Sequence, residues 1–334
     1  MSRHNRERGV LPRPLAVLGA LALAAVTGVA IRMLPAGAAA PAPKPPPVAW
    51  HTPAAAPPAA EPLAGFVGFV DTAEDPGFDL PADSRRTGIR RYALGHLVSG
   101  GDGCAPKWNG PLDPGQNRVA NRIGRLRALG GDAAPVFGGP DGQELAVTCR
   151  RPGGLASAYR RVVGAFDAAS IDFEVRDSAD RAAVLRRARA IHAVQRERRL
   201  GVSFTLPLKP YGLSSGDVAM LRATHRAGAT VETVNLLAGI EPRTAPSGRL
   251  HRVAAAVLAA RDQVARAQDL PDPEQAWPRI ALTPVLTGRS DLSETDARAL
   301  ASYATRHGLA WLSLRGVAPK ADVSRILWST SSGR

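Results

Sequence analysis

The sequence predicts an α/β fold: a closed (β/α)8 TIM barrel preceded by an N-terminal membrane segment and a Pro/Ala-rich linker. Eight short apolar, strand-like runs recur along residues 65–315, and helical patterns lie between most of them. Strands that alternate with helices favour a parallel sheet. Eight such units within residues 65–334 fit a closed barrel better than an open, doubly wound sheet.

The barrel elements follow one another in a regular order. The expected strands are 65–71, 92–100, 133–139, 170–175, 201–208, 231–239, 279–286 and 309–315. The expected helices are 117–130, 155–166, 180–199, 215–228, 250–267 and 293–308. No strand is followed by GxGxxG and no GxxxxGK[ST] occurs, so the phosphate loops of nucleotide-binding folds are absent from the sequence.

The first 64 residues differ from the rest in composition. Residues 1–12 are basic and predict a cytoplasmic N-terminus, because positive charges stay on the cytoplasmic side of a membrane segment. Residues 13–32 contain an uncharged apolar run, which is either a retained transmembrane anchor or the apolar region of a cleaved signal peptide. Residues 33–64 are rich in Pro and Ala and predict an extended spacer. Under both alternatives the barrel, residues 65–334, is extracytoplasmic, either membrane-anchored or secreted.

Two cysteines, Cys104 and Cys149, are the only ones in the chain. Outside the cytoplasm such a pair is usually oxidised, so we expect a disulfide if the chain is exported. In the chain-entropy model the loop would contribute roughly 4 kcal/mol. No Cys/His spacing resembles a metal site, and we expect neither a metal nor a cofactor.

The formal net charge of +14 raises the question of anionic partners. Nucleic acid is an improbable one for an exported protein, whereas an anionic cell-envelope polymer or lipid headgroups would be accessible. In the Arg-rich helix the apolar positions form one face. We therefore expect Arg186, Arg187 and Arg189 to lie off that face, in solvent, with contact to envelope anions as the alternative.

The fourth strand-like run continues into the stretch SIDFEVRD. Asp172, Glu174 and Arg176 fall at alternate positions, which places them on one face of a strand. Three interpretations are open. The trio forms an ion-pair network that fills the barrel mouth, it forms a binding site for an anionic or sugar ligand, or Glu174 acts as an acid.

The whole series of runs resembles glycoside hydrolase family 18, the chitinases, especially their compact bacterial secreted members. The likeness extends over most of 66–327 and includes GFVGFVDT, CAPKWNG, VFGG before Cys149, IDFEV, SFTLPL, VETVNLLA, LTPVLTG and LAWLSL. It implies a barrel that binds or cleaves N-acetylglucosamine polymers, with the active site at the carboxyl ends of the strands. It also accounts for the paired cysteines.

The resemblance implies a DxDxE pattern whose last Glu is the general acid. In this sequence the pattern reads Asp172, Glu174 and Arg176, so a guanidinium, which keeps its proton, stands at the acid position. Other motif positions have changed as well. The Ser of the third-strand SxGG is replaced, the Met-Asp-Tyr of the sixth strand reads Gly239, Ile240 and Glu241, and the eighth-strand Trp is Arg315.

The sequence therefore predicts an extracytoplasmic chitinase-like barrel that is non-catalytic and binds a glycan or an anionic envelope component. The alternatives are an active family 18 glycosidase that hydrolyses N-acetylglucosamine-containing glycans, and a scaffold without a ligand. No catalytic residue is expected. The candidate ligand contacts are Trp108, Gly138, Gly139, Asn235, Glu241 and Arg315. Trp108, which follows the second strand, is the best candidate for a sugar contact, and all histidines are interpreted as structural or surface residues.

Overall fold

The computed structural model describes residues 65–101, 103–241, 244 and 248–329. The predicted basic N-terminus (1–12), membrane or signal segment (13–32) and linker (33–64) lie outside the described residues. Among the helices that are described, none has the length and apolar character needed to cross a membrane.

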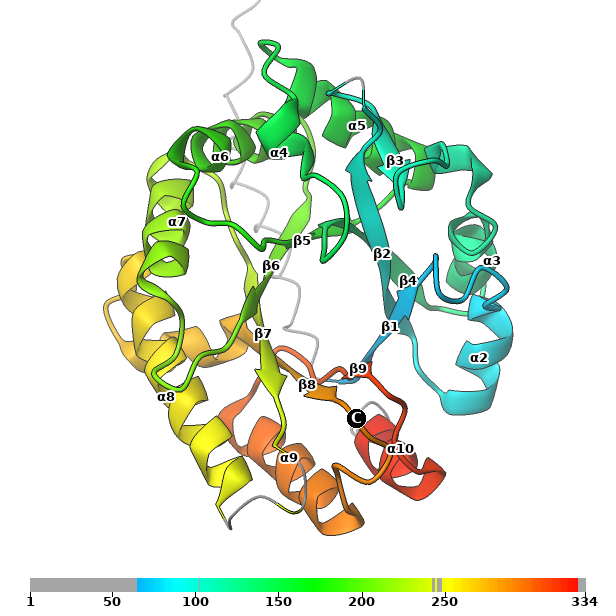
Figure 1. Ribbon diagram of the computed structural model, residues 1–334, viewed down its shortest axis with the longest axis vertical. Helices are drawn as coiled ribbons and strands as arrows, with labels where there is room; N and C mark the ends of the chain where they lie inside the picture. Colours follow the sequence, from blue (N-terminus) through cyan, green and yellow to red (C-terminus); the bar gives the residue numbers. More distant parts are fainter. Residues whose placement is uncertain (1–64, 102, 242–243, 245–247, 330–334) are drawn as a thin grey trace, which may run out of the picture. The chain divides into compact units, whose positions relative to one another are not determined.

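The strands form a parallel barrel in chain order, and this confirms the prediction from the alternating runs (Figure 1). Neighbouring strands pair in the order β1-β2-β4-β5-β6-β7-β8-β9. The ring is nearly closed by the backbone around Leu312, which pairs in parallel with Phe66 and also with Leu282. The bounds are β1 Val67–Asp71, β2 Arg91–Ser99, β4 Asp132–Gly138, β5 Ser170–Glu174, β6 Gly201–Pro207, β7 Thr233–Gly239, β8 Ile280–Leu286 and β9 Arg315–Gly316.

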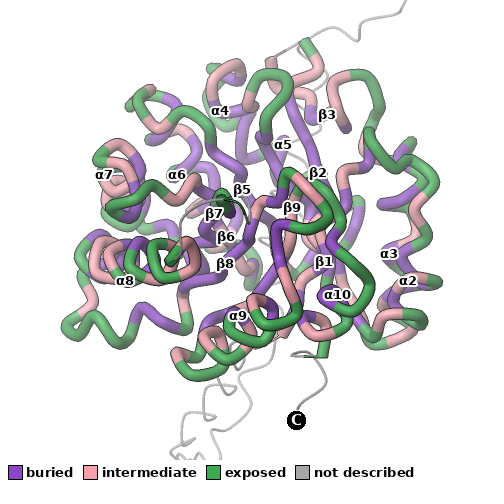
Figure 2. The backbone as a smooth tube through the Cα atoms, turned by 60° about the horizontal axis from the view of Figure 1, so that its bottom comes forward, coloured by how far each residue is buried: buried purple, intermediate pink, exposed green. Residues whose placement is uncertain are grey.

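Helices surround this barrel, and the core lies between them and the strands (Figure 2). The expected helices are present as α3 Ile123–Arg127, α5 Gly154–Phe166, α6 Arg181–Gln195, α7 Ser215–Arg226, α8 Arg249–Ala267 and α9 Glu294–His307. Three further helices were not predicted: α2 Leu80–Thr87, α4 Leu145–Thr148 and α10 Ala321–Trp328. α4 has four residues and α2 and α10 have eight each, so these helices are too short to show a clear helical period in the sequence.

The expectation for the Arg-rich helix α6 holds at the exposed Arg189, only in part at the half-buried Arg186, and is wrong at Arg187. Arg187 is buried against the barrel, forms an ion pair with Glu144, and places its guanidinium over the ring of Phe204. The reason lies in the helical period. Arg187 follows Val184 by three positions and precedes Ile191 by four, so it belongs to the buried stripe that the apolar residues define.

The second strand is extended by a short hairpin. Strand β3, Pro106–Trp108, pairs antiparallel with β2 and folds the following segment back onto the barrel. Cys104, just before β3, is bonded to Cys149 after α4, which confirms the predicted disulfide. This bond ties the β2–β3 connection to the segment that follows β4.

Candidate functional site

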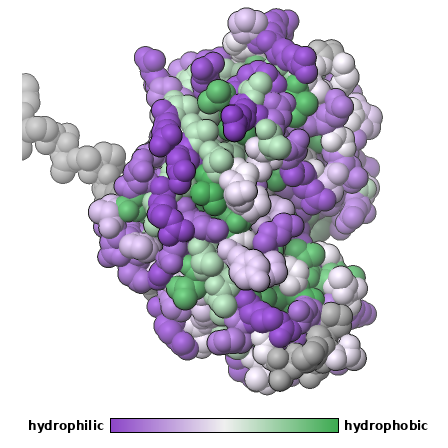
Figure 3. Space-filling model, turned by 60° about the vertical axis from the view of Figure 1, so that its left-hand side comes forward, coloured by the Kyte–Doolittle hydropathy of each residue, from purple (hydrophilic) through white to green (hydrophobic). Residues whose placement is uncertain are grey.

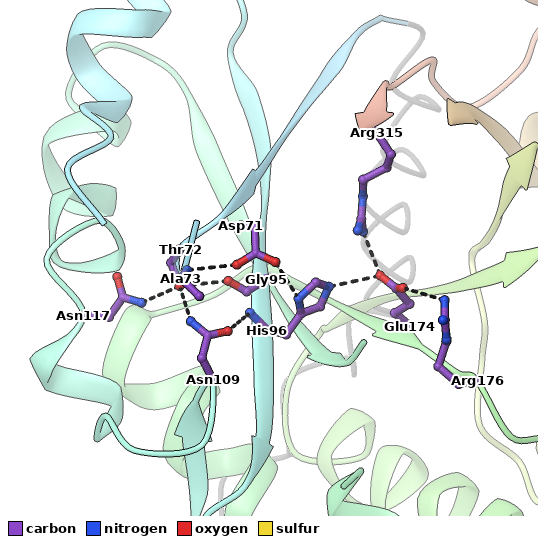
Figure 4. A network of polar contacts seen from close by, with 10 residues as sticks. All are labelled: Asp71, Thr72, Ala73, Gly95, His96, Asn109, Asn117, Glu174, Arg176 and Arg315. Atoms are coloured by element: carbon purple, nitrogen blue, oxygen red, sulfur yellow. Dashed lines mark hydrogen bonds and ion pairs between the residues drawn. The ribbon is translucent and has the colours of Figure 1, made fainter. Parts of the chain in front are cut away.

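Four charged side chains meet at the carboxyl ends of strands that are far apart in sequence (Figure 4). Asp71 ends β1, His96 lies near the end of β2, Glu174 ends β5 and Arg315 begins β9. His96 lies between Asp71 and Glu174, and Arg315 contacts the same Glu174 oxygen as His96 does. We call these four residues the mouth cluster, because they lie at the end of the barrel where TIM-barrel enzymes hold their active sites.

The alternation in SIDFEVRD orients the two acids, but not the arginine. Asp172 and Glu174 are both buried, as expected for residues that share one strand face. Strand β5 ends at Glu174, so Arg176 lies beyond it. The Arg176 side chain is 55% exposed and its Nη1 is 3.8 Å from Glu174 Oε1. Arg176 therefore pairs with Glu174 as expected, but it does so from the edge of the site, and His96 and Arg315 are the closer partners of Glu174.

A bulge in β2 directs His96 into the barrel. Leu94 pairs with Pro135 and Leu97 with Phe137, so β2 takes three steps where β4 takes two. Such an extra residue re-aims a side chain, and here it re-aims the segment that contains His96. Gly139, at φ 105°, allows the close approach, since a Cβ there would lie 2.4 Å from the His96 ring carbon Cδ2.

Both ring nitrogens of His96 face carboxylate oxygens. Nδ1 is 3.2 Å from Asp71 Oδ2, and Nε2 is 3.1 Å from Glu174 Oε2. An ionised carboxylate only accepts hydrogen bonds, so both nitrogens donate when both acids are ionised, and the ring is then an imidazolium. Burial favours the neutral ring, but the hydrogen bonds to Asp71 and Glu174 outweigh it and raise the pKa of His96.

Glu174 is the centre of the cluster. Its Oε2 also accepts a hydrogen bond of 2.9 Å from Arg315 Nη2. Burial favours the protonated acid, but the His96 hydrogen bond and the Arg315 charge together lower the pKa of Glu174. The Arg315 side chain is 14% exposed and its guanidinium lies over the ring of Phe69. When His96 is protonated, the two anions of the mouth cluster are balanced by His96 and Arg315, and the half-exposed Arg176 adds a positive charge at its edge.

A second group of polar side chains supports the cluster from the β1–β2 side. Thr72 donates to Gly95 O at 2.8 Å and accepts hydrogen bonds from Asn117 Nδ2 at 2.8 Å and Asn109 Nδ2 at 3.3 Å. Asn109 Oδ1 in turn accepts from the His96 backbone N–H. Both contacts are made to the peptide group that joins Gly95 and His96 within the bulge, so Thr72 and Asn109 together fix the backbone at His96 (Figure 4).

A different polar layer lies deeper in the barrel. Asp172 accepts hydrogen bonds from the hydroxyls of Ser203 and Thr205. Asn235 Nδ2 donates to Thr205 at 3.1 Å, and Asn235 Oδ1 accepts from Thr283 at 2.7 Å. Burial raises the pKa of Asp172 to about 6, since its two hydroxyl partners offset the cost of burial only in part.

Several predicted ligand contacts have other roles here. Trp108 is fully buried: its ring packs edge-on against Phe166, and its Nε1 donates to Pro114 O. The prediction of a sugar contact at Trp108 is therefore wrong, because the indole is fully buried against α5. Asn235 lies within the deep layer. Glu241 is exposed and forms an ion pair with Arg252.

The two glycines at the end of β4 have a structural role in the backbone. Gly138 and Gly139 both have positive φ, and Gly139 N donates to Glu174 O at 3.0 Å. A Cβ at Gly138 would come within 2.3 Å of the same carbonyl oxygen. Their role in the structure is to bring β4 close to β5 and His96.

Sequence reasoning missed two members of the mouth cluster, Asp71 and His96, and His96 was interpreted as a structural or surface residue. Its signal was weak, because a single His at a strand end has no partner within its own motif. Across the described residues, no group of three or more His, Cys, Asp or Glu side chains is arranged to hold a metal ion.

Comparisons with known proteins give the same fold. No family model matches the chain. A probable bifunctional chitinase/lysozyme of Escherichia coli (strain K12) is 25% identical over 180 residues, and endochitinase 11 of Metarhizium anisopliae is 24% identical over 183 residues. Each alignment covers 52% of this chain, but only 20% and 34% of the respective relative.

Solved structures extend the likeness to the whole barrel. The catalytic domain of a hyperthermophilic chitinase from Pyrococcus furiosus superposes with a TM-score of 0.69 at 24% identity, covering 81% of this chain and 96% of that one. A glycoside hydrolase family 18 chitinase from Pseudoalteromonas aurantia has a TM-score of 0.58 at 10% identity, covering 80% and 100%. The chain therefore has a barrel fold like that of the family 18 chitinases.

Proposed function

We propose that this chain is a non-catalytic, chitinase-like barrel that binds an N-acetylglucosamine-containing glycan. The observation that carries the loss of catalysis is the state of Glu174. Arg176 stands at the position of the general acid, and the nearest buried carboxylate is fixed between His96 and Arg315. An acid catalyst needs a proton that it can give up near neutral pH, and Glu174 has its pKa lowered instead.

Asp172 does not replace it. A pKa of about 6 is in the useful range for an acid. However, Asp172 is buried, and its two oxygens are occupied by Ser203 and Thr205 in the deep layer. A leaving-group oxygen at the barrel mouth would have to displace those contacts.

Glycan binding is supported by the fold. One similar structure, of the active domain 2 of the Pyrococcus furiosus chitinase, is described as complexed with chito-oligosaccharides. The present barrel keeps that architecture, and the balance of Asp71 and Glu174 by His96 and Arg315 is compatible with an uncharged polar ligand at the mouth. Binding without cleavage would use the mouth as a recognition site.

The first experiment tests hydrolysis. Purified protein with an aryl chitobioside and with chitohexaose is expected to release no product above a boiled control, because loss of the acid alone removes about 10² to 10⁴ in rate. A clear rate that disappears in the Glu174→Gln or Asp172→Asn variant would establish the active glycosidase instead. A rate that neither variant changes would indicate a contaminating enzyme, and purification would be repeated until that rate is gone.

The second experiment tests binding. Isothermal titration with chitohexaose is expected to give a measurable affinity, whereas cellohexaose, which lacks the acetamido groups, is expected to bind more weakly. Heparin serves as the anionic polymer. Binding to heparin alone would favour the anionic-component interpretation, and binding to none of the three would favour a scaffold.

We further propose that the barrel is extracytoplasmic, either anchored by residues 13–32 or released after their removal. The bond between Cys104 and Cys149 supports this placement, since such bonds persist in oxidising compartments. Thiol labelling of protein taken directly from cells is expected to modify neither cysteine until reductant is added. Labelling of both cysteines without reductant would contradict export. The mass of the mature protein distinguishes a retained anchor from a cleaved signal peptide, because cleavage shortens the chain at its N-terminus.

A further inference from the structure

One aromatic side chain stands apart from the others in its exposure. Tyr211, in the loop between β6 and α7, is 88% exposed. Among the aromatic residues in the described part of the chain, no other is classed as exposed. Most of the others belong to the core or pack against it.

The backbone that carries Tyr211 is held firmly. Lys209 and Gly212 exchange two backbone hydrogen bonds, of 2.7 and 3.0 Å, which close a tight turn around Pro210 and Tyr211. Gly212 has φ 94°, and a Cβ there would lie 2.9 Å from Ala260 N, so the turn lies directly on α8. The exposed ring therefore sits on an ordered turn.

A side chain of α8 fixes the same turn a second time. Gln263 Oε1 accepts from Leu213 N at 2.6 Å, while its Nε2 donates to Leu213 O at 3.2 Å and to Tyr211 O at 3.4 Å. Tyrosine has few rotatable bonds, so presenting its ring from a fixed backbone costs little conformational entropy on binding. This arrangement is a preformed contact surface.

The turn is connected to the site but lies outside it. It continues from β6, which carries Thr205 of the deep layer and pairs with β5 and β7 on its two sides. The loop leaves the sheet after Leu208 N donates to Leu237 O, and then packs on the outer helix α8 rather than on the mouth cluster. Seen from the α7–α8 side, the surface has hydrophobic side chains gathered in a hollow between hydrophilic ones (Figure 3).

We propose that Tyr211 is a remote glycan contact. A pyranose ring of a long oligosaccharide stacks on Tyr211, while another part of the same oligosaccharide occupies the barrel mouth. This inference rests on the proposed glycan-binding function. The C–H groups on one face of an N-acetylglucosamine ring are apolar and slightly positive, and they complement the negative face of an aromatic ring. Lys209, exposed beside it, has no ion pair within the described residues and can donate to a hydroxyl or acetamido oxygen.

The test compares ligand length. Dissociation constants are measured for chitobiose and chitohexaose with the unaltered full-length protein, Tyr211→Ala, Tyr211→Phe and the control Leu185→Ala, which removes an exposed apolar side chain of α6. Tyr211→Ala is expected to weaken chitohexaose binding roughly three- to tenfold and to leave chitobiose binding unchanged. Tyr211→Phe and Leu185→Ala are expected to bind both ligands like the unaltered protein.

The outcomes separate this inference from the function on which it rests. If the unaltered protein binds chitohexaose and Tyr211→Ala binds it equally well, the remote contact is refuted while glycan binding stands. If Tyr211→Ala weakens both ligands equally, the ring belongs to the mouth site and the remote contact is also refuted. If the unaltered protein binds neither ligand, the proposed function fails and this inference with it. Thermal melts show that each variant is folded.

Discussion

Asp172 and Glu174 are two carboxylates on one strand, two residues apart and both buried, yet their protonation is shifted in opposite directions. The pKa of Asp172 is raised to about 6, and that of Glu174 is lowered. Burial disfavours the charged form of each, so burial does not explain the difference. The partners explain it, because Asp172 has hydroxyl donors while Glu174 has His96 and Arg315.

This difference bears directly on function. A carboxylate that is paired with two cations is stable as an anion and is a poor proton donor. Neutral hydroxyls stabilise an anion less, so Asp172 keeps its proton to higher pH, but it lies in a layer closed by Thr205 and Asn235. Of the two buried carboxylates of β5, one has a suitable pKa and the other lies at the mouth, and neither combines the two properties.

The largest expected effect comes from removing the buried cation. Arg315→Met leaves the buried Glu174 with one cationic partner fewer, and should lower the free energy of unfolding at pH 7 by about 3–5 kcal/mol. Arg176→Met is the matched control, because it removes the same group from the same carboxylate at a half-exposed position. It should cost less than about 1 kcal/mol. Denaturant unfolding of both variants measures the difference.

The pH dependence of the Arg315→Met defect follows from the sign of the Glu174 shift. A lowered pKa in the folded state stabilises the protein above the unfolded-state value, and this stabilisation is lost as the pH falls through the folded-state pKa. The defect should therefore be largest near neutral pH and shrink below about pH 4. Equal losses for the two arginine variants would show that Arg176 and Arg315 are equivalent, contrary to their burial.

Neutral replacements of the two acids should have opposite consequences. Glu174→Gln leaves His96 and Arg315 without their anion and should cost about 2 kcal/mol at pH 8. Asp172→Asn removes a charge that burial opposes, since a raised pKa in the folded state destabilises the protein increasingly above pH 4. Its stability at pH 8 should lie within about 1 kcal/mol of the parent or exceed it. Urea unfolding at pH 4 and pH 8 measures both effects. A larger loss of stability for Asp172→Asn than for Glu174→Gln would contradict the expected difference between the two carboxylates.

A smaller effect is expected for the histidine. The pKa of His96 is raised, so its contribution to stability is complete below the unfolded-state value near 6.5 and disappears as the pH rises through the folded-state pKa. His96→Gln should remove this component, which is on the order of 1 kcal/mol. Exposed His251→Gln is the control. Unfolding free energies from pH 5 to pH 9 test this, and an unchanged pH profile in His96→Gln would place the titration elsewhere.

The sequence identified the charged residues of the altered motif, but it predicted their arrangement only in part. Arg176 was expected to balance Asp172 and Glu174, because all three alternate along one run. That argument holds only while the strand continues, and β5 ends at Glu174. The residues that do balance Glu174 come from β2 and β9, at positions 96 and 315, and only Arg315 had been expected at the mouth.

Trp108 and Arg187 are two further residues whose surroundings were not predicted from the sequence. Each was assigned to the surface from its residue type and local position, and each is buried by a contact distant in sequence: Trp108 by Phe166 and Arg187 by Glu144 and Phe204. The burial of Arg187 could have been predicted from the helical period. The burial of Trp108 could not, because it depends on a hairpin that no local sequence pattern predicts.

The sequence by itself determined the alternation of strands and helices, the barrel and the pairing of the two cysteines, because each depends on local periodicity, composition or a single residue type. Only the tertiary structure decided which charges meet at the mouth and which carboxylate keeps its proton. A barrel brings together the ends of strands that are far apart in the sequence, some by nearly the whole length of the domain. The protonation state of a buried group is then determined by the atoms within a few ångströms of it. Those neighbours are determined by the closure of the ring and by one bulge in β2.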